Sequence, residues 1–188
     1  MGHVVLFHSV YGLRPAVLTA ADRLRAAGHT VDTPDLYGEP AAETVEDGFA
    51  LLREIGQEAV LDRARAALGE APADAVLAGF SMGAGVAGAL LAERPDAAAL
   101  LLLCGTGGEP EAVRPGLPVQ LHLSDPDDYD AEPEVAQWRR AMTAAGAELS
   151  VHRYPGVGHL YTDPELPDHD AAAAARTWER AVAFLADR

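Results

Sequence analysis

The residues from Val76 to Gly85 combine a short apolar run with a serine held between glycines. The apolar run predicts a buried strand, and the small residues after Ser81 predict the start of a helix. Between them, Gly79-Phe80-Ser81-Met82-Gly83 matches the G-x-S-x-G pattern. On a tight turn from strand to helix, flanking glycines let the backbone approach closely while the serine Oγ projects above the sheet. The pattern therefore predicts a nucleophile for acyl transfer.

A serine hydroxyl is a poor nucleophile at neutral pH and needs an adjacent base. Of the seven histidines, His159 stands out because it follows Tyr154-Pro155-Gly156-Val157-Gly158, a flexible loop after the last predicted strand. We expect this loop to hold the imidazole over Ser81, and His169 is the second candidate. His8 ends the first predicted strand and is better suited to a supporting role than to direct catalysis.

The acid that orients such a histidine should lie in the loop that follows the strand predicted over residues 118–123. Asp125, Asp127 and Asp128 are the candidates, and each also suits a turn or a helix cap. Spacing alone does not separate them. Any of the three completes the chain order serine, acid, histidine, which is the order found in α/β hydrolases.

A second motif overlaps the first, because residues 83–88 read Gly-Ala-Gly-Val-Ala-Gly, a literal dinucleotide-binding pattern. That pattern should begin at the end of a strand and be followed about 20 residues later by an acid at the next strand end. Here it begins four residues after Gly79, and the next strand ends in Leu103-Cys104-Gly105. We interpret these glycines as the face of a helix packed closely on a sheet.

The surrounding pattern alternates strands with helices over residues 1–188, which predicts a single α/β domain with a mostly parallel sheet of about six strands. The expected strands cover residues 4–8, 30–32, 74–79, 98–103, 118–123 and 148–154. The expected helices cover residues 16–27, part of 41–56, 58–68, 81–93, 134–145 and a last segment capped by Asp168 or Asp170. In such sheets, active groups gather at the carboxyl ends of the strands.

The composition limits the classes of partner. Asp and Glu number 29 against 14 Lys and Arg, a net charge of −15, which argues against nucleic acid and anionic membranes. We see no signal peptide and no apolar run of transmembrane length. Cys104 is the single cysteine, so no internal disulfide forms, which fits a cytoplasmic protein. We expect a monomer or homodimer, with no metal and no organic cofactor.

Five segments, in order along nearly the whole chain, resemble the dienelactone hydrolase family of α/β hydrolases. They are Leu6 to Gly12, Pro34 to Tyr37, Gly79 to Gly83, Leu121 to Tyr129 and Pro155 to His159. In the family pattern the acid comes just before a short stretch that ends in an aromatic residue, which implies Asp127. The family's second oxyanion donor, a backbone N–H after the first strand, corresponds to that of Val10.

The resemblance implies a serine hydrolase that cleaves small esters or lactones through an acyl-enzyme. Ser81 would attack, His159 would transfer the proton, Asp127 would orient His159, and the N–H groups of Val10 and Met82 would hold the oxyanion. The alternatives are a catalytically inactive, hydrolase-like protein that binds small molecules, and a thioesterase or acyltransferase.

This chain departs from the family's namesake enzymes at three positions. Ser81 replaces a cysteine, Ser9 replaces a glutamate, and Asp163 replaces an arginine four residues after the catalytic histidine. We therefore expect dienelactone to be a poor substrate, although Arg14 offers a positive charge nearby. No large cap insertion is present, and the expected pocket wall consists of Tyr11, Phe49, Met82, Tyr129, Leu160 and Tyr161.

Overall fold

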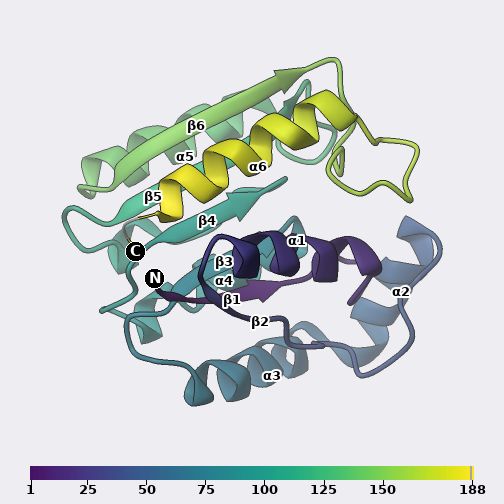
Figure 1. Ribbon diagram of the computed structural model, residues 1–188, viewed down its shortest axis with the longest axis horizontal. Coiled ribbons are helices and arrows are strands. Elements are labelled where there is room, and N and C mark those ends of the chain that lie inside the picture. The colour runs from purple at the N-terminus through teal and green to yellow at the C-terminus, as the bar shows by residue number, and fades with distance from the viewer. Residues whose placement is uncertain (187) are drawn as a thin grey trace.

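A parallel six-stranded sheet in the order β2-β1-β3-β4-β5-β6 forms the centre of the computed structural model, which describes residues 1–186 and 188 (Figure 1). The strands are β1 (His3–Phe7), β2 (Thr30–Asp32), β3 (Val76–Phe80), β4 (Leu100–Leu103), β5 (Pro118–Asp125) and β6 (Glu148–Pro155). All five pairings are parallel, which confirms the predicted α/β fold. The central strands are apolar throughout because helices cover both of their faces.

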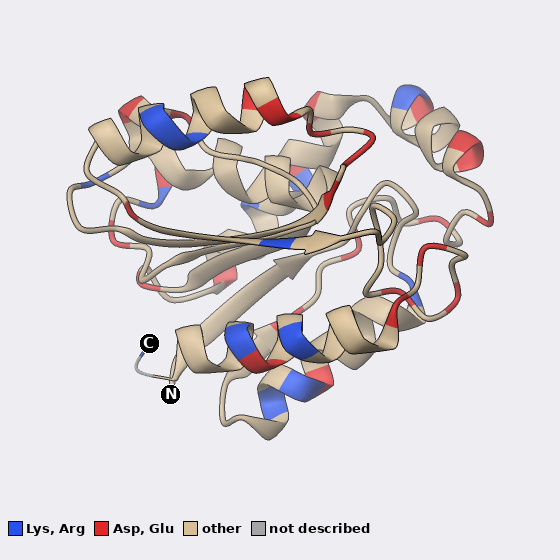
Figure 2. Ribbon diagram, turned by 90° about the horizontal axis from the view of Figure 1, so that it is seen from above, with Lys and Arg blue, Asp and Glu red and all other residues tan. Residues whose placement is uncertain are grey.

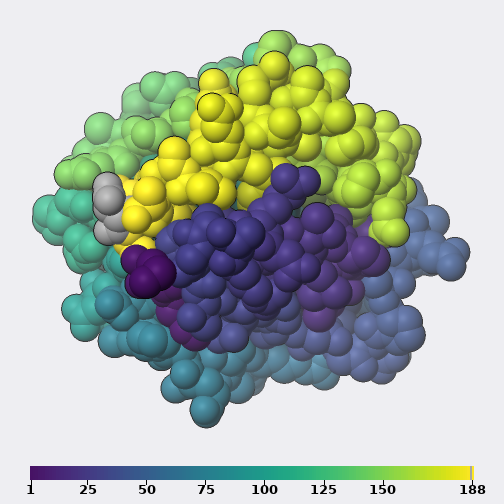
Figure 3. All heavy atoms as spheres, in the orientation of Figure 1, coloured from purple at the N-terminus to yellow at the C-terminus, as the bar shows by residue number. Residues whose placement is uncertain are grey.

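Helices lie on both faces of the sheet, and the side chains of each strand alternate between them. The helices are α1 (Pro15–Ala26), α2 (Val45–Ile55), α3 (Gln57–Glu70), α4 (Met82–Ala89), α5 (Glu132–Ala144) and α6 (Ala171–Leu185). On β1, Val4 and Leu6 pack with α1 and α6, whereas Val5 and Phe7 pack with α3 and α4. Figure 3 shows the face that α1 and α6 cover together.

The structure moves several predicted boundaries. The helix after Ser81 ends at Ala89, and a separate 3₁₀ turn covers Leu91–Glu93. Helix α5 begins at Glu132, two residues earlier than expected, because Pro133 fits the first turn of a helix. Strands β5 and β6 remain paired up to Asp125 and Pro155, beyond the predicted ends.

Because the strands are parallel, the loops that follow β1, β3, β5 and β6 lie at one edge of the sheet. Figure 2 shows that acidic positions recur along the loops at this edge. Helix α2, capped by Thr44, whose side chain accepts from the Asp47 N–H, stands beside the same edge in Figure 1. No helix in the described part of the chain is both long and apolar enough to span a membrane.

Candidate active site

Ser81 occupies a strained turn between β3 and α4. Its φ of 50° and ψ of −112° are unusual for a residue with a side chain, and its N–H donates to the Leu103 carbonyl over 2.8 Å. The surrounding backbone leaves no room for a side chain at the two flanking positions, Gly79 and Gly83. A Cβ on Gly79 would lie 2.1 Å from the Gly83 oxygen, and a Cβ on Gly83 would lie 2.4 Å from the Phe7 oxygen. The local geometry is that of a nucleophile elbow, as the G-x-S-x-G pattern predicts.

Three of the predicted site residues form one hydrogen-bonded chain. The Nε2 of His159 lies 2.8 Å from the Ser81 Oγ, and its Nδ1 lies 2.9 and 3.0 Å from the two carboxylate oxygens of Asp127. The side chains of His159 and Asp127 are both buried. Asp127 therefore holds the Nδ1–H tautomer, which leaves Nε2 free to accept the serine proton.

Asp127 is surrounded by donors besides His159. Ser124 Oγ donates over 2.5 Å, and the backbone N–H groups of Tyr129 and Asp130 donate over 2.9 and 3.1 Å. Burial alone would raise the pKa of Asp127, but the hydrogen bonds from His159, Ser124 and Tyr129 outweigh it and lower the pKa to about 2. The carboxylate is thus ionised at neutral pH and fixed in orientation.

The other candidate acids and the second candidate histidine make different contacts. Asp125 ends β5, half exposed, and its nearest cation is Arg153 at 3.9 Å. Asp128 is exposed at the mouth of the site. His169 bonds through Nδ1 to the Tyr161 carbonyl over 3.0 Å. Neither Asp125 nor His169 joins the hydrogen-bonded chain of Ser81.

The backbone N–H groups of Val10 and Met82 have no acceptor within the described residues. The Ser9 carbonyl, on the peptide that carries the Val10 N–H, accepts from His8 Nδ1 over 2.7 Å and from the Gly12 N–H over 3.0 Å. Because the N–H and C=O of a trans peptide point in opposite directions, these bonds also fix the direction of the Val10 N–H. His8 accepts the Leu36 N–H at Nε2 over 3.0 Å, and burial lowers its pKa, so it is a neutral support.

A cavity of about 180 Å³ opens beside Ser81 and His159. Its apolar lining consists of Val10, Tyr11, Val45, Phe49, Tyr129 and Leu160. The ring of Tyr129 lies 4.5 Å from that of His159, centroid to centroid, and the ring of Phe49 lies 6.5 Å from that of Tyr129. Four of the expected wall residues, Tyr11, Phe49, Tyr129 and Leu160, therefore line this cavity.

The other two expected wall residues lie elsewhere. Tyr161 is fully buried and hydrogen-bonds through its hydroxyl to Thr177 over 2.8 Å, so it belongs to the core instead of the cavity. The sulfur of Met82 accepts from the Tyr37 hydroxyl at 3.3 Å, which turns that side chain away from the lining. Met82 directly follows Ser81, and Tyr161 directly follows Leu160. Because adjacent side chains point in different directions, one of each pair can face the cavity while the other does not.

Asp168 lines the cavity, although the sequence suggested only a helix cap for it. Its Oδ2 accepts the Leu160 N–H over 3.1 Å, next to His159. The helix cap is Asp170, which accepts the Ala173 N–H over 2.7 Å. In the sequence, the only feature that connects Asp168 with the site is that it lies, like His159, between the last strand and the last helix. That feature is too general to identify a lining residue.

Arg14 is not available to a substrate carboxylate. Its Nε lies 3.0 Å from an oxygen of Asp163, and its Nη2 donates to Glu165 over 3.1 Å. A third contact, from Nη1, goes to the Ala42 carbonyl over 3.3 Å. Asp163 is thus the partner of Arg14 in an ion pair buried beside the site.

Gly83 packs closely against the backbone of β1, as expected from the sequence, whereas Gly88 packs against a loop and Gly85 meets nothing within 4 Å. A Cβ on Gly88 would lie 1.9 Å from the Gly108 N. Among the described residues, no group of three or more His, Cys, Asp or Glu side chains is arranged to hold a metal ion.

The family model of the dienelactone hydrolase family matches residues 2–188. The chain belongs to the dienelactone hydrolase family. No curated protein sequence matches it significantly. As a member of this family, the chain is a carboxylic ester hydrolase by class, and its α/β-hydrolase fold agrees with that class.

Several solved structures share the fold of this dienelactone hydrolase family member. A dienelactone hydrolase-like promiscuous phosphotriesterase from metagenomic libraries is 21% identical, with a TM-score of 0.80 over 98% of this chain and 85% of its own. A putative dienelactone hydrolase from Klebsiella pneumoniae is 19% identical, with a TM-score of 0.78 over 99% and 87%. Esterase PE8 is 21% identical, with a TM-score of 0.65 over 98% and 91%.

Proposed function

We propose that this protein is a serine hydrolase that cleaves small carboxylic esters or lactones through a covalent acyl-enzyme. The observation that carries the proposal is the continuous hydrogen-bonded chain from Ser81 through His159 to Asp127. The strained turn at Ser81 supports the same chemistry, as do the N–H groups of Val10 and Met82, which meet no acceptor in the described part of the chain.

The reaction begins with attack of Ser81 Oγ on the ester carbonyl while His159 Nε2 takes the serine proton. The N–H groups of Val10 and Met82 donate to the oxyanion of the tetrahedral intermediate. The C–O bond to the alcohol breaks, and His159 gives its proton to the departing oxygen. A water molecule then attacks the acyl-enzyme as His159 takes one of its protons. The bond between the acyl carbon and Ser81 Oγ breaks, His159 returns the proton to that oxygen, and the acid is released. Asp127 stabilises the positively charged imidazole in both halves.

The size of the cavity, about 180 Å³, favours small acyl and alcohol groups. Dienelactone carries a carboxylate, and we expect it to be a poor substrate. The cavity lining includes the acids Asp128 and Asp168, while Arg14 is already paired with Asp163 and Glu165. The preferred substrates of the proposed enzyme are therefore esters or lactones that lack a carboxylate.

We further propose that the protein acts on small molecules in the cytoplasm as a monomer or homodimer. The net charge of −15 disfavours nucleic acid and anionic membranes as partners. The single cysteine, Cys104, is buried and forms no disulfide, which fits a reducing compartment. Sedimentation analysis of the purified protein, and fractionation of the cells that produce it, test these two points.

The test of the catalytic proposal is labelling with a fluorophosphonate probe, with the modified residue identified by mass spectrometry. The wild type and Ser150→Ala, which removes an exposed serine on β6, should be labelled at Ser81 and should hydrolyse p-nitrophenyl acetate equally. Ser81→Ala should lose both the label and the activity. Folded wild-type protein that neither reacts with the probe nor hydrolyses esters would instead favour a binding protein with a hydrolase fold.

A further inference from the structure

The cavity beside Ser81 combines aromatic rings with carboxylates. Tyr11, Phe49 and Tyr129 contribute the rings, and Asp128 and Asp168 contribute the charges. None of the described residues that line this cavity is a lysine or an arginine. Phe49 is 38% exposed and Tyr129 is 54% exposed, so both keep a large apolar surface in water beside the nucleophile. Ring faces next to carboxylates are the surroundings that organic cations prefer.

Asp168 is the better placed of the two carboxylates. It is partly buried, and its bond to the Leu160 N–H fixes one oxygen next to His159. Asp168 lines the cavity together with Tyr11, and burial followed by the charge of Asp168 raises the pKa of the Tyr11 hydroxyl, against the lowering effect of Arg14. Asp128 is exposed, so solvent screens its charge more strongly.

The neighbouring cation does not cancel this charge. The guanidinium of Arg14 lies over the Tyr11 ring, 5.1 Å from its centroid, but it is paired with both Asp163 and Glu165. These three side chains together carry a net charge of −1. Within the described residues, neither Asp128 nor Asp168 forms an ion pair, so both carboxylates remain unpaired beside the cavity.

We propose that this cavity selects esters that carry an ammonium group close to the scissile bond, with Asp168 as the main specificity-determining residue and Asp128 as the second. The proposal rests on the ester hydrolase activity proposed above and specifies its substrate class. The rings of Tyr11, Phe49 and Tyr129 surround the ammonium group, and the two carboxylates balance its charge. An ester that carries a carboxylate at the same position is repelled.

The test compares three acetate esters of similar size by pH-stat titration at low ionic strength. Acetylcholine carries the cation, 3,3-dimethylbutyl acetate is its uncharged isostere, and 4-acetoxybutanoate carries an anion. We expect kcat/KM to decrease in that order, with at least a tenfold difference between the first and the last. Added salt should reduce the difference, because it screens the charges of Asp128 and Asp168.

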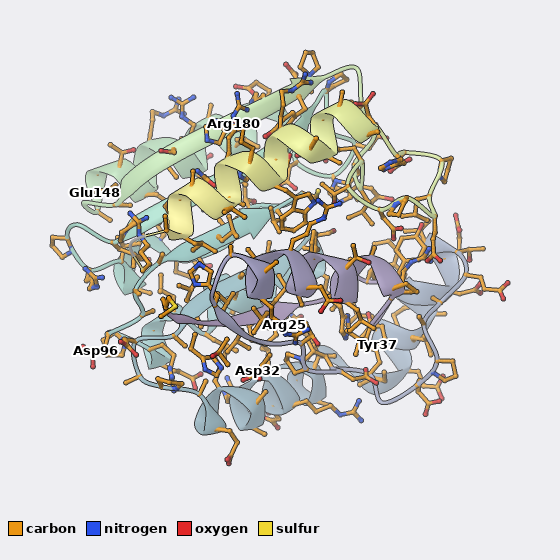
Figure 4. All side chains as sticks on the ribbon, viewed as in Figure 1. Arg25, Asp32, Tyr37, Asp96, Glu148 and Arg180 are labelled. Carbon is orange, nitrogen blue, oxygen red and sulfur yellow. The ribbon has the colours of Figure 1, made fainter. Side chains whose placement is uncertain are left out.

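Asp168→Asn and Asp128→Asn remove one charge each, and the asparagine at 168 keeps an oxygen that can accept the Leu160 N–H. Each should lower the ratio of kcat/KM for acetylcholine to that for 3,3-dimethylbutyl acetate, by about threefold to tenfold at position 168 and by less at position 128. The control is Asp96→Asn, which changes the net charge equally. Asp96 is exposed and lies at the opposite end of the sheet in Figure 4, so the ratio should not change.

A binding measurement separates this proposal from the proposed activity. Calorimetry should show that choline binds more tightly than 3,3-dimethylbutanol, and that Asp168→Asn reduces the difference by about threefold to tenfold. If none of the three esters is hydrolysed while this preference persists, the activity is wrong and the charge selectivity stands. Equal kcat/KM for the charged and uncharged esters, or an unchanged ratio in Asp168→Asn, would overturn the selectivity.

Discussion

Ser124 donates a 2.5 Å hydrogen bond to Asp127, the acid that faces His159. Ser124 lies on β5 and is fully buried, so the bond is shielded from water. A hydrogen bond to a charged acceptor is shorter and stronger than one between neutral groups. Strand β5, which leads into the loop that carries Asp127, thus also helps to hold this carboxylate in its ionised form.

Ser124→Ala should raise the pKa of Asp127 above its value of about 2, because one of the donors that stabilise the carboxylate is lost. Since the native pKa lies below the ordinary value, this bond stabilises the fold fully above about pH 4 and progressively less as the pH falls to 2. The loss of unfolding free energy should be about 1–2 kcal/mol at pH 7 and smaller at pH 2.5.

Urea unfolding at the two pH values, with NMR titration of the Asp127 carboxyl carbon, measures both effects of Ser124→Ala. Activity should fall by less than about tenfold, because His159 and the N–H groups of Tyr129 and Asp130 still hold the carboxylate. Ser150→Ala, an exposed change on the neighbouring strand, serves as the control. An unchanged titration of Asp127 would contradict the role given to Ser124.

Asp127→Asn should reduce kcat by a factor on the order of 10⁴, while Asp125→Asn should leave it within about twofold. The amide of an asparagine at 127 donates to His159 Nδ1, which selects the tautomer with a proton on Nε2. That imidazole cannot take the serine proton. Among the described residues, the Asp125 carboxylate forms no hydrogen bond with His159, and its one ion pair is with Arg153 at 3.9 Å. Steady-state kinetics of ester hydrolysis measure kcat for both variants. A large fall of kcat in Asp125→Asn alone would reverse the assignment of the acid.

The sequence predicted the sheet and the elbow because both follow from short-range rules. A wholly apolar strand such as Leu100–Leu103 must be buried on both faces, and Gly79 and Gly83 suit a turn that has no room for a Cβ. The resemblance to the family supplied the choice of Asp127, which the spacing of the three acids did not. In the structure, the loop conformation brings Asp127 to within 2.9 Å of His159 Nδ1.

The lining of the cavity could not be predicted as well, because it depends on side-chain direction in irregular loops. Leu160 and Tyr161 are adjacent, yet the first lines the cavity and the second is buried against Thr177. The ion pair of Arg14 with Asp163 joins residues that are distant in sequence, and Asp168 and Tyr11, which line the same cavity, are also far apart. No local periodicity encodes such contacts, so the charge of the site emerges only from the assembled fold.

Tyr129→Ala should raise KM for uncharged esters by about threefold to tenfold with little change in kcat. The Tyr129 ring lies 4.5 Å from the His159 ring and supplies apolar surface to the substrate without reaching the reacting atoms. A loss of binding energy that is equal in the ground state and the transition state raises KM and leaves kcat unchanged. Tyr129→Phe retains the ring and should behave like the wild type. A large fall in kcat for Tyr129→Ala would show instead that the ring positions His159.

Gly83→Ala should destabilise the fold by about 2 kcal/mol or more, because the new Cβ would lie 2.4 Å from the Phe7 oxygen and 2.5 Å from the His8 oxygen. These oxygens belong to fixed backbone, so the strain must move either β1 or the start of α4. Gly85→Ala is the matched control in the same helix, since a Cβ there meets nothing within 4 Å.

Because alanine favours a helix more than glycine does, Gly85→Ala should be neutral or stabilising by up to about 1 kcal/mol. Urea unfolding gives both free energies, and ester hydrolysis should remain unchanged in Gly85→Ala. The residual folded fraction of Gly83→Ala should lose activity, since a displaced His8 backbone moves the Ser9 peptide that presents the Val10 N–H. Equal stability of the two variants would show that the approach of α4 to β1 is looser than these distances require.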